Sequence, residues 1–268
     1  MSTLSVPVYY VDAFTDTLFH GNPAAIVLLD EWLPDDKLIA IAAEINLSET
    51  AFLVGEHIRW FTPVMEVKLC GHATLAASYI LNQFKQHPAN PIVFQSLSGE
   101  LTVHKNQEGF TLDFPILDCE PADLSQYPQL SEILGTPISE LYLAKDRYIC
   151  FVDSPEQVQN CHPNMLRLAQ LPLQGLTITA KSADSPTHDE QCDFVSRYFA
   201  PAKGVNEDPV TGTSHCAIAP LWAKRLQKNP VLGHQISARG GKIHCLVERN
   251  RVKMTGKATL FLAGTIHF

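Results

Sequence analysis

The sequence predicts an α+β protein of two similar halves, each with many strands around one main helix. Two observations indicate this class. Short apolar runs with strand character recur along the chain, and a set of short segments occurs twice in the same order. The length of 268 residues fits two halves, because a single hydrophobic core reaches its practical limit at about 250–300 residues.

The first half contains the clearest individual elements. Pro34, Asp35 and Asp36 start a pattern with apolar residues at helical spacing, which predicts a helix over residues 31–45. A second helix is expected over residues 74–84, and residues 118–137, rich in Pro, Ser and acidic side chains, are expected to connect the halves. Strands are predicted at residues 8–13, 24–29, 50–54, 58–62, 92–96, 100–104 and 110–114.

The internal repeat rests on three pairs of segments. Residues 59–63 (RWFTP) match residues 197–201 (RYFAP) at an offset of 138. Residues 70–77 match residues 211–218 at an offset of 141, each being a small-residue loop that opens a helical pattern. Glycine-led hairpins at 99–103 and 241–245 follow at an offset of 142. Three matches in one order predict a duplicated module, in which the two helix-opening loops are equivalent and face each other across a cleft.

Composition narrows the class of partner. The chain has 20 Lys and Arg against 28 Asp and Glu, a formal net charge of −8, and no long basic run, so nucleic-acid binding is disfavoured and a small molecule is expected. No apolar stretch is long enough to span a membrane and the N-terminus does not resemble a signal peptide, so we expect a cytoplasmic protein that does not bind membranes. Seven cysteines without a CxxC pair predict reduced thiols.

Glu49 is the first candidate for chemistry. It lies between a helical pattern and an apolar strand, where partial burial would raise its pKa and let it take and return a proton near neutral pH. The alternative is a solvated residue at a strand start, or a capping partner of Ser48.

The two repeated loops are the second candidate. Their small residues let backbone N–H groups face a ligand, and a helix N-terminus favours a carboxylate or enolate oxygen. His72 in the first loop could donate a proton or hold an anion, although a lone histidine is more often a buried structural residue. Glu207 and Asp208 precede the second loop and could supply a partner carboxylate, or form a turn before Pro209.

Metal and cofactor sites have no support in the sequence. The pairs His215-Cys216 and His244-Cys245 lack the spacing of zinc ligands, so no metal is expected. Cys70 lies at a helix start but has no histidine and orienting residue to complete a cysteine hydrolase. Glycine-rich phosphate-binding motifs are missing, so the sequence predicts chemistry without a cofactor.

Several motifs occur in order along nearly the whole chain: Val11-Asp-Ala-Phe14 with Gly21-Asn-Pro23, Asn46-Leu-Ser-Glu-Thr50, Phe61-Thr-Pro63, Cys70-Gly-His-Ala-Thr74 and Glu207-Asp-Pro-Val-Thr-Gly212. As an ordered set, they resemble the phenazine biosynthesis-like PhzF family. The resemblance implies a diaminopimelate epimerase-like fold of two pseudo-symmetric lobes, each a curved β-sheet or barrel around a central helix. It places one lobe at residues 1–117, joined by the C-terminal strand 259–268, and the other at 118–258. A homodimer is also implied.

The resemblance also implies the residues of the site. The family's catalytic glutamate corresponds to Glu49, its histidine to His72, its aspartate to Asp208, and its small hydroxyl residue to Thr213, where serine is commoner. The characterised phenazine member moves a proton between carbons of a dihydro-hydroxyanthranilate without a cofactor. We therefore expect an isomerase acting on a small, cyclic or unsaturated carboxylate. The residues expected to bind the substrate are Asn22, Ser48, Gly71, Ala73, Thr74, Gly212 and Ser214.

One departure from the wider superfamily limits the chemistry. Its epimerases and racemases use two cysteines, one at each helix-opening loop, whereas this chain has Cys70 in the first loop and Thr211 in the second. A threonine hydroxyl is far too weak an acid to replace a thiolate, so two-base inversion is disfavoured. The alternatives left open are a metabolite-binding protein on this scaffold and a one-cysteine racemase acting through Cys70.

Overall fold

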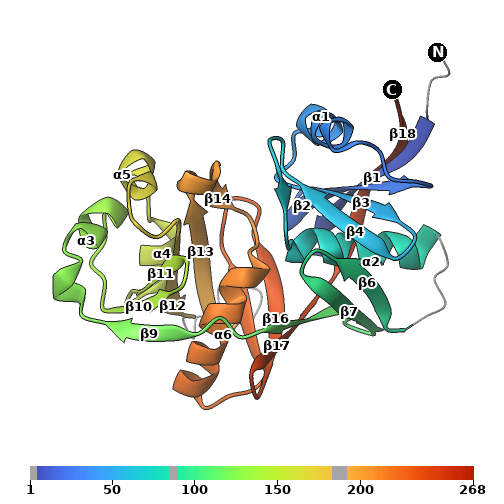
Figure 1. The fold of residues 1–268 in the computed structure, drawn as a ribbon. Helices are drawn as coiled ribbons and strands as arrows, with labels where there is room; N and C mark the ends of the chain where they lie inside the picture. The colour runs from blue at the N-terminus through green and yellow to red at the C-terminus, as the bar shows by residue number, and fades with distance from the viewer. Residues whose placement is uncertain (1–4, 85–89, 183–191) are drawn as a thin grey trace. The chain divides into compact units, whose positions relative to one another are not determined.

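The computed structural model describes residues 5–84, 90–182 and 192–268, and the chain divides into two compact units (Figure 1). Unit 1 comprises Met1–Asp113 and Thr255–Phe268, and unit 2 comprises Phe114–Met254. The C-terminal segment therefore belongs to the same unit as the N-terminus, because the last strand pairs with the first over its whole length.

Unit 1 is a sheet of mixed direction with two helices. In order of pairing, β18 (Ala258–His267) is antiparallel to β1 (Ser5–Ala13), which is antiparallel to β2 (Asn22–Leu29). β2 is parallel to β3 (Thr50–Val54), and β3 is antiparallel to β4 (His57–Phe61). The remaining elements are β5 (Glu66–Val67), β6 (Ile92–Ser96), β7 (Gly99–Asn106), β8 (Gly109–Pro115), α1 (Asp35–Ile45) and α2 (Gly71–Phe84).

Unit 2 repeats this connectivity. β9 (Cys119–Ala122) pairs antiparallel with β10 (Glu140–Ala144), then β11 (Arg147–Phe151) follows antiparallel and β12 (Gly175–Lys181) parallel. The other strands are β13 (Phe194–Ala200), β14 (Val205–Asp208), β15 (Val231–Gln235), β16 (Gly241–Glu248) and β17 (Arg251–Gly256). The helices are η1 (Leu124–Gln126), α3 (Gln129–Leu134), α4 (Pro155–Gln159), α5 (Met165–Ala169), η2 (Pro201–Lys203) and α6 (Gly212–Leu226).

Strand register confirms the internal repeat. β4 pairs antiparallel with β3 and β5 and parallel with β6, and β13 makes the same three kinds of pairing with β12, β14 and β15. Phe61 lies opposite Glu66 in unit 1, and Phe199 lies opposite Glu207 in unit 2. The predicted α+β class and the duplication are therefore both correct.

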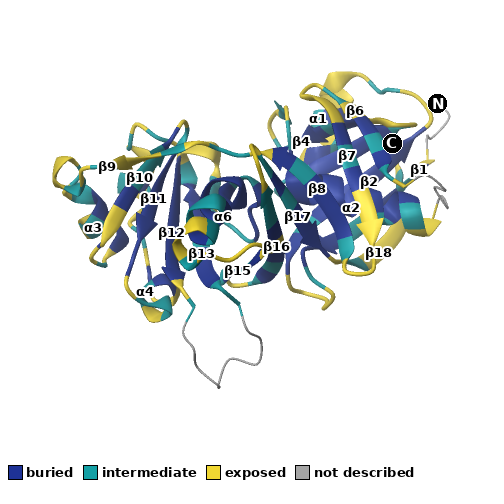
Figure 2. Ribbon diagram, turned by 90° about the horizontal axis from the view of Figure 1, so that it is seen from below, coloured by how far each residue is buried: buried dark blue, intermediate teal, exposed yellow. Residues whose placement is uncertain are grey.

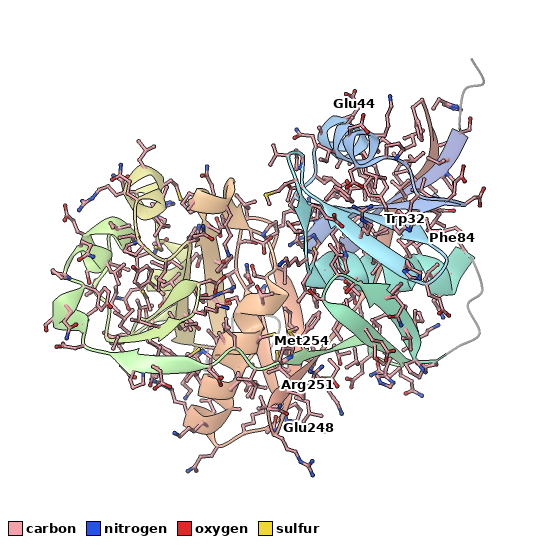
Figure 3. All side chains as sticks on the ribbon, viewed as in Figure 1. Trp32, Glu44, Phe84, Glu248, Arg251 and Met254 are labelled. Carbon is pink, nitrogen blue, oxygen red and sulfur yellow. The ribbon has the colours of Figure 1, made fainter. Side chains whose placement is uncertain are left out.

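The main helix of each unit is buried against its sheet. α2 buries most of its residues, including the small side chains Ala73, Ala76, Ala77 and Ser78, and contacts β1, β2 and β3. A helix that is apolar or small on every side is typical of a buried helix, and small residues let the strands approach it closely. α6 is buried in the same way, and Met254, labelled in Figure 3, lies close to Gly212 in its first turn.

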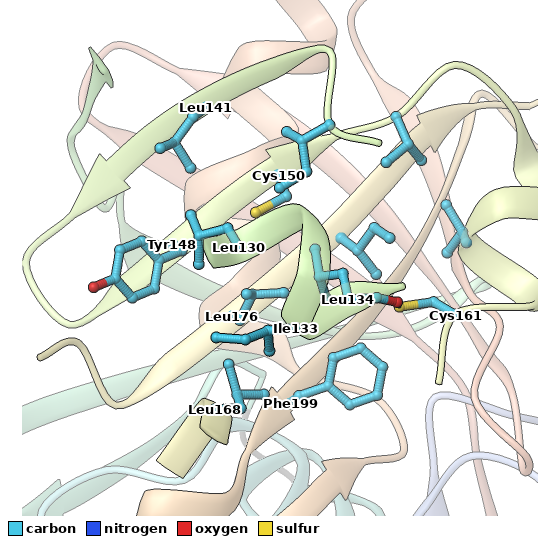
Figure 4. Close-up of a cluster of buried hydrophobic side chains, with 14 of the residues drawn as sticks. Leu130, Ile133, Leu134, Leu141, Tyr148, Cys150, Cys161, Leu168, Leu176 and Phe199 are labelled. Carbon is cyan, nitrogen blue, oxygen red and sulfur yellow. The ribbon is translucent and has the colours of Figure 1, made fainter. Parts of the chain in front are cut away.

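A second hydrophobic layer covers each sheet on the face away from this helix. In unit 1, Ala25, Val27 and Phe52 pack with Leu38 and Ala42 of α1. In unit 2 the corresponding cluster is larger and includes three residues of α3, packed on β10, β11 and β12 (Figure 4). Because both faces are covered, the central strands are buried, whereas β18 is mostly exposed (Figure 2).

Three sequence predictions require correction. The helix predicted from residue 31 begins at Asp35, and the helix predicted from residue 74 begins at Gly71. The two repeated loops are thus the first turns of α2 and α6. Cys70 O accepts from the Thr74 N–H at 3.2 Å and from Thr74 Oγ1 at 2.6 Å, and Thr211 O accepts from the His215 N–H at 3.2 Å and from His215 Nδ1 at 2.9 Å. The connection predicted at residues 118–137 contains β9 and α3, since β9 finds its partner in β10.

A bidentate arginine–glutamate pair occurs at the same place in each unit. Arg59 donates to both carboxylate oxygens of Glu66 at 2.7 Å, and its guanidinium lies 5.0 Å from the ring centre of Phe61 and 5.3 Å from that of Trp32 (labelled in Figure 3). Arg197 donates to Glu207 at 2.7 and 2.9 Å, and its Nη1 also donates to three backbone carbonyls, of Val158, Gln159 and Cys161. We call these the Arg59 clamp and the Arg197 clamp.

His215 of α6 is fully buried, with the Phe194 ring 5.8 Å away. Its Nδ1 donates to the Thr211 carbonyl, so the ring holds its proton there, and among the described residues Nε2 has no hydrogen-bond partner. Burial disfavours the charged ring and lowers the pKa of His215 to about 4.

None of the seven cysteines forms a disulfide bond, as the sequence predicts, and five of them are buried. None of the described helices combines the length and the apolar character needed to cross a membrane.

Arg197→Lys tests the Arg197 clamp. We expect the free energy of unfolding to fall by about 2 kcal/mol, because lysine keeps the charge but loses the planar fork and the three carbonyl contacts. The control is Arg167→Lys, which disrupts an exposed bidentate pair with Glu132 and should leave the free energy of unfolding nearly unchanged. Urea denaturation monitors both variants, and equal effects would contradict the structural role of the Arg197 clamp.

His215 predicts a loss of stability in acid. The pKa of His215 is lower in the folded chain than in the unfolded chain, so the unfolded state binds more protons between pH 6.5 and about 4, and stability falls as pH falls through that range. The full effect is about 3 kcal/mol. His215→Leu should remove this part of the pH dependence of the unfolding free energy, while His57→Gln on the exposed start of β4 should keep it. An unchanged profile in His215→Leu would contradict this assignment.

Candidate active site

Glu49 is held at the start of β3. Asn46, in the left-handed conformation, ends α1, and β3 begins four residues later, immediately after Glu49, so the parallel pairing of β3 with β2 fixes the position of Glu49. The Glu49 side chain is only one-fifth exposed. This burial raises the pKa of Glu49, and the neighbouring Ser48 hydroxyl partly opposes the rise.

His72, in the first turn of α2, lies between Glu49 and Cys70. Its Nε2 is 3.5 Å from Glu49 Oε2, and its Nδ1 is 3.5 Å from Cys70 Sγ. His72 and Cys70 are both buried. An imidazole placed between a carboxylate and a thiol can exchange protons with either, so unit 1 carries a three-member acid/base group.

These three side chains are also the one group in the described part of the chain whose ligand atoms lie close enough to hold a metal ion, all within 4.8 Å. Cys70 Sγ lies 3.5 Å from His72 Nδ1 and 4.0 Å from Nε2, and Nε2 also lies 3.5 Å from Glu49 Oε2. An ion bound at Nε2 would therefore have both other ligand atoms within reach. The same three side chains also suit proton transfer, which needs no ion.

In unit 2, Asp208 and Thr211 form a network with Gln235. The Thr211 hydroxyl donates to Asp208 Oδ2 in a short hydrogen bond. Gln235 accepts from the Thr211 N–H at 2.9 Å and donates to Asp208 O at 2.6 Å and to Thr211 Oγ1 at 3.1 Å. The network fixes the turn that starts α6. Sequence analysis missed Gln235, since a lone amide at the end of an apolar strand carries no signal.

Thr213 is the second residue of α6, as His72 is of α2. Its hydroxyl accepts hydrogen bonds from Arg147, which sequence analysis also missed. Arg147 opens an apolar strand after a turn, and its sequence context does not distinguish it from a surface arginine.

The structure separates the other predicted residues by what their side chains do. Gly71 and Gly212 begin the two helices, where backbone N–H groups have no partner within the helix. Thr74 and Ser214 are fully buried, and their hydroxyls are bonded to Cys70 O and Thr177 Oγ1. These two side chains therefore hold their helices and do not face a ligand. Ala73 and Asn22 are fully buried, and the Glu207 carboxylate is engaged by Arg197.

Comparison with known proteins places this geometry in a family. The model of the family "Phenazine biosynthesis-like protein" matches residues 11–264. The chain belongs to the phenazine biosynthesis-like family. A Pseudomonas aeruginosa protein named as an uncharacterized isomerase is 43% identical, with 98% of this chain and 99% of that protein covered. These findings confirm the family resemblance predicted from the motifs.

Solved structures agree. The crystal structure of a PhzF-family protein from Enterococcus faecalis is 40% identical, with a TM-score of 0.90 over 99% of this chain and 100% of that chain. A hydroxyproline epimerase from Agrobacterium vitis shares the fold at a TM-score of 0.60 and 11% identity, over 100% of this chain and 92% of that chain. The epimerase-like fold is thus confirmed, and the family relatives support an isomerase or epimerase.

Glu49→Gln should stabilise the protein at pH 7. Because the pKa of Glu49 is raised in the folded chain, burying its charge costs stability that grows as pH rises from the ordinary value of 4.5 through the raised pKa. Glutamine carries no charge, so its advantage should be present at pH 7 and absent below pH 4.5. Urea denaturation across pH measures it. Glu44→Gln on the exposed face of α1 (Figure 3) is the control, and a Glu49→Gln variant less stable at pH 7 would contradict the assignment.

Proposed function

We propose that this protein is a cofactor-independent isomerase that moves a proton between carbons of a small carboxylate, with Glu49 as the acid/base. The observation that carries the proposal is a carboxylate largely withdrawn from water, with a raised pKa and His72 Nε2 at 3.5 Å. A carboxyl group with a raised pKa can both remove and return a proton near neutral pH.

In the proposed reaction, one proton moves between two carbons of the substrate. Glu49 takes a proton from a carbon acidified by a conjugated carboxylate or carbonyl, and the electron pair of that C–H bond enters the conjugated system. The protonated Glu49 then returns the proton to another carbon, so the double bond shifts and no net oxidation occurs. His72 assists because its Nε2 faces Glu49 and can either donate a proton toward the carboxyl group or accept one from it.

Unit 2 supplies groups suited to negative charge. Thr213 and the backbone N–H groups at the start of α6 are hydrogen-bond donors at the positive end of a helix. Donors of this kind contribute about 3–4 kcal/mol each when they are aimed at charge that develops in the transition state. We assign them to the substrate anion, and Asp208, oriented by Thr211, to a proton on the substrate.

The test uses proton NMR in D₂O with a panel of cyclic and unsaturated carboxylates that includes a dihydro-hydroxyanthranilate. We expect deuterium incorporation or double-bond migration with the wild type, and a fall of at least about 100-fold with Glu49→Gln, because a positioned general base contributes 10²–10⁴-fold. Glu44→Gln is the matched control, since it changes the same residue type on exposed α1. Full turnover by a folded Glu49→Gln variant would refute the role of Glu49. Ligand binding without exchange would favour a metabolite-binding protein.

A second candidate is inversion at a carbon through Cys70, favoured by the 3.5 Å contact between its thiol and His72. Cys70→Ser discriminates between the two bases. Turnover that survives in Cys70→Ser and is lost in Glu49→Gln supports Glu49, whereas the opposite pattern, together with inactivation by thiol alkylation, supports Cys70.

A further inference from the structure

Arg147 is the one lysine or arginine that is buried among the residues the structure describes, at 4% exposure. Burying a cation is costly unless it is paired. Asp146 supplies the counter-charge, since Arg147 Nε donates to Oδ1 at 2.8 Å and Nη2 donates to Oδ2 at 2.9 Å. Asp146 is itself one-third exposed and also pairs with Lys203 at the surface. The pair with Asp146 therefore neutralises the charge of Arg147 but does not explain why the Arg147 side chain is buried.

The buried end of Arg147 is directed at Thr213. Nη1 and Nη2 both lie 3.3 Å from Thr213 Oγ1, with the guanidinium donating and the hydroxyl oxygen accepting. A threonine oxygen has two acceptor lone pairs, and the two N–H groups occupy both. The hydroxyl hydrogen therefore cannot point toward the guanidinium, and Thr213 is left as a donor only.

Arg147 does not belong to the framework that the two units share. Thr50 lies opposite Phe61 as Leu176 lies opposite Phe199, and Ala25 pairs with Thr50 as Tyr148 pairs with Leu176. The position before Tyr148 is Arg147, and the position before Ala25 is Ala24, which is apolar and buried. The clamp arginines, by contrast, occur in both units. Unit 1 forms the same sheet without a cation here, so the fold does not require Arg147.

Resting on the proposed function, we propose that Arg147 is a positioning residue that makes the Thr213 hydroxyl an obligate hydrogen-bond donor to an anionic oxygen of the substrate. Tyr198 fixes the guanidinium, with its ring centre 4.8 Å away, and Asp146 fixes its plane. The anionic oxygen is either the carboxylate of the bound substrate or an oxygen that gains charge when the substrate loses its proton.

A double-mutant cycle tests the coupling of the two side chains. Arg147→Met removes the cation at similar volume, and Thr213→Val removes the hydroxyl. If Arg147 acts through Thr213, Arg147→Met lowers kcat/KM by at least about 10-fold with Thr213 present and by less than about 3-fold in Thr213→Val. Arg147→Lys should restore little, because lysine offers no fork. Equal effects in both backgrounds would overturn the proposal. Arg167→Met, in the exposed pair with Glu132, is the control for loss of an arginine.

The split between KM and kcat identifies which oxygen is bound. A rise in KM alone in Arg147→Met indicates the substrate carboxylate, and an equal fall in kcat and kcat/KM indicates the developing charge.

A binding measurement separates this proposal from the role of Glu49. In the Glu49→Gln variant, which needs no turnover, benzoate should shift the amide NMR signals of Gly212 and Thr213 at about 10 mM, enough to detect a millimolar Kd. Neutral benzamide should not, and Arg147→Met should weaken benzoate binding by at least about 10-fold. No benzoate shift at these amides, or a shift unaffected by Arg147→Met, would overturn the proposal even if Glu49 proves to be the base.

Discussion

The two arginine–glutamate clamps determine where each central helix begins. Each clamp ties β5 or β14 to the neighbouring strand, β4 or β13, and in both units the helix starts five residues after the clamp glutamate. Because the guanidinium is planar and makes two parallel hydrogen bonds, it fixes the direction of the short strand as well as its distance. The clamps therefore position the first turns of α2 and α6. These turns carry His72 and Thr213.

Burial of the two helices then sets the electrostatic properties of the residues around their first turns. Burial shields the first turns of α2 and α6 from bulk water, and the N–H groups there have no partner within the helix, so the field of the helix is little screened. The same exclusion of water raises the pKa of Glu49 and lowers that of His215. Both shifts have one physical cause, the cost of a charge in a poorly solvated place, yet Glu49 borders the site whereas His215 lies in the core.

The duplicated framework carries unlike residues at its equivalent positions. Where unit 1 has Glu49, unit 2 has Gly175, and a Cβ there would lie 2.3 Å from the Tyr198 hydroxyl. Unit 2 therefore has no room for a second carboxylate at that point. At the position equivalent to His72, unit 2 has Thr213, whose hydroxyl oxygen accepts from the buried Arg147, and the Thr211 hydroxyl donates to Asp208. Glu49 of unit 1 thus has no carboxylate counterpart in unit 2, which is consistent with the proposed one-base proton transfer.

The sequence by itself determined the α+β class, the repeat, the family and Glu49 and His72 as candidates, because short motifs and apolar periods are local signals. Only the tertiary structure decided which polar side chains form hydrogen bonds within the protein. In the sequence, Thr74, Ser214 and Glu207 resemble ordinary site residues, because their partners are not visible there. It also identified Arg147 and Gln235, each a lone polar residue on an apolar strand. Their partners, Thr213 and Thr211, lie 66 and 24 residues away in the chain, and hydrogen bonds at that separation leave no periodic trace in a sequence.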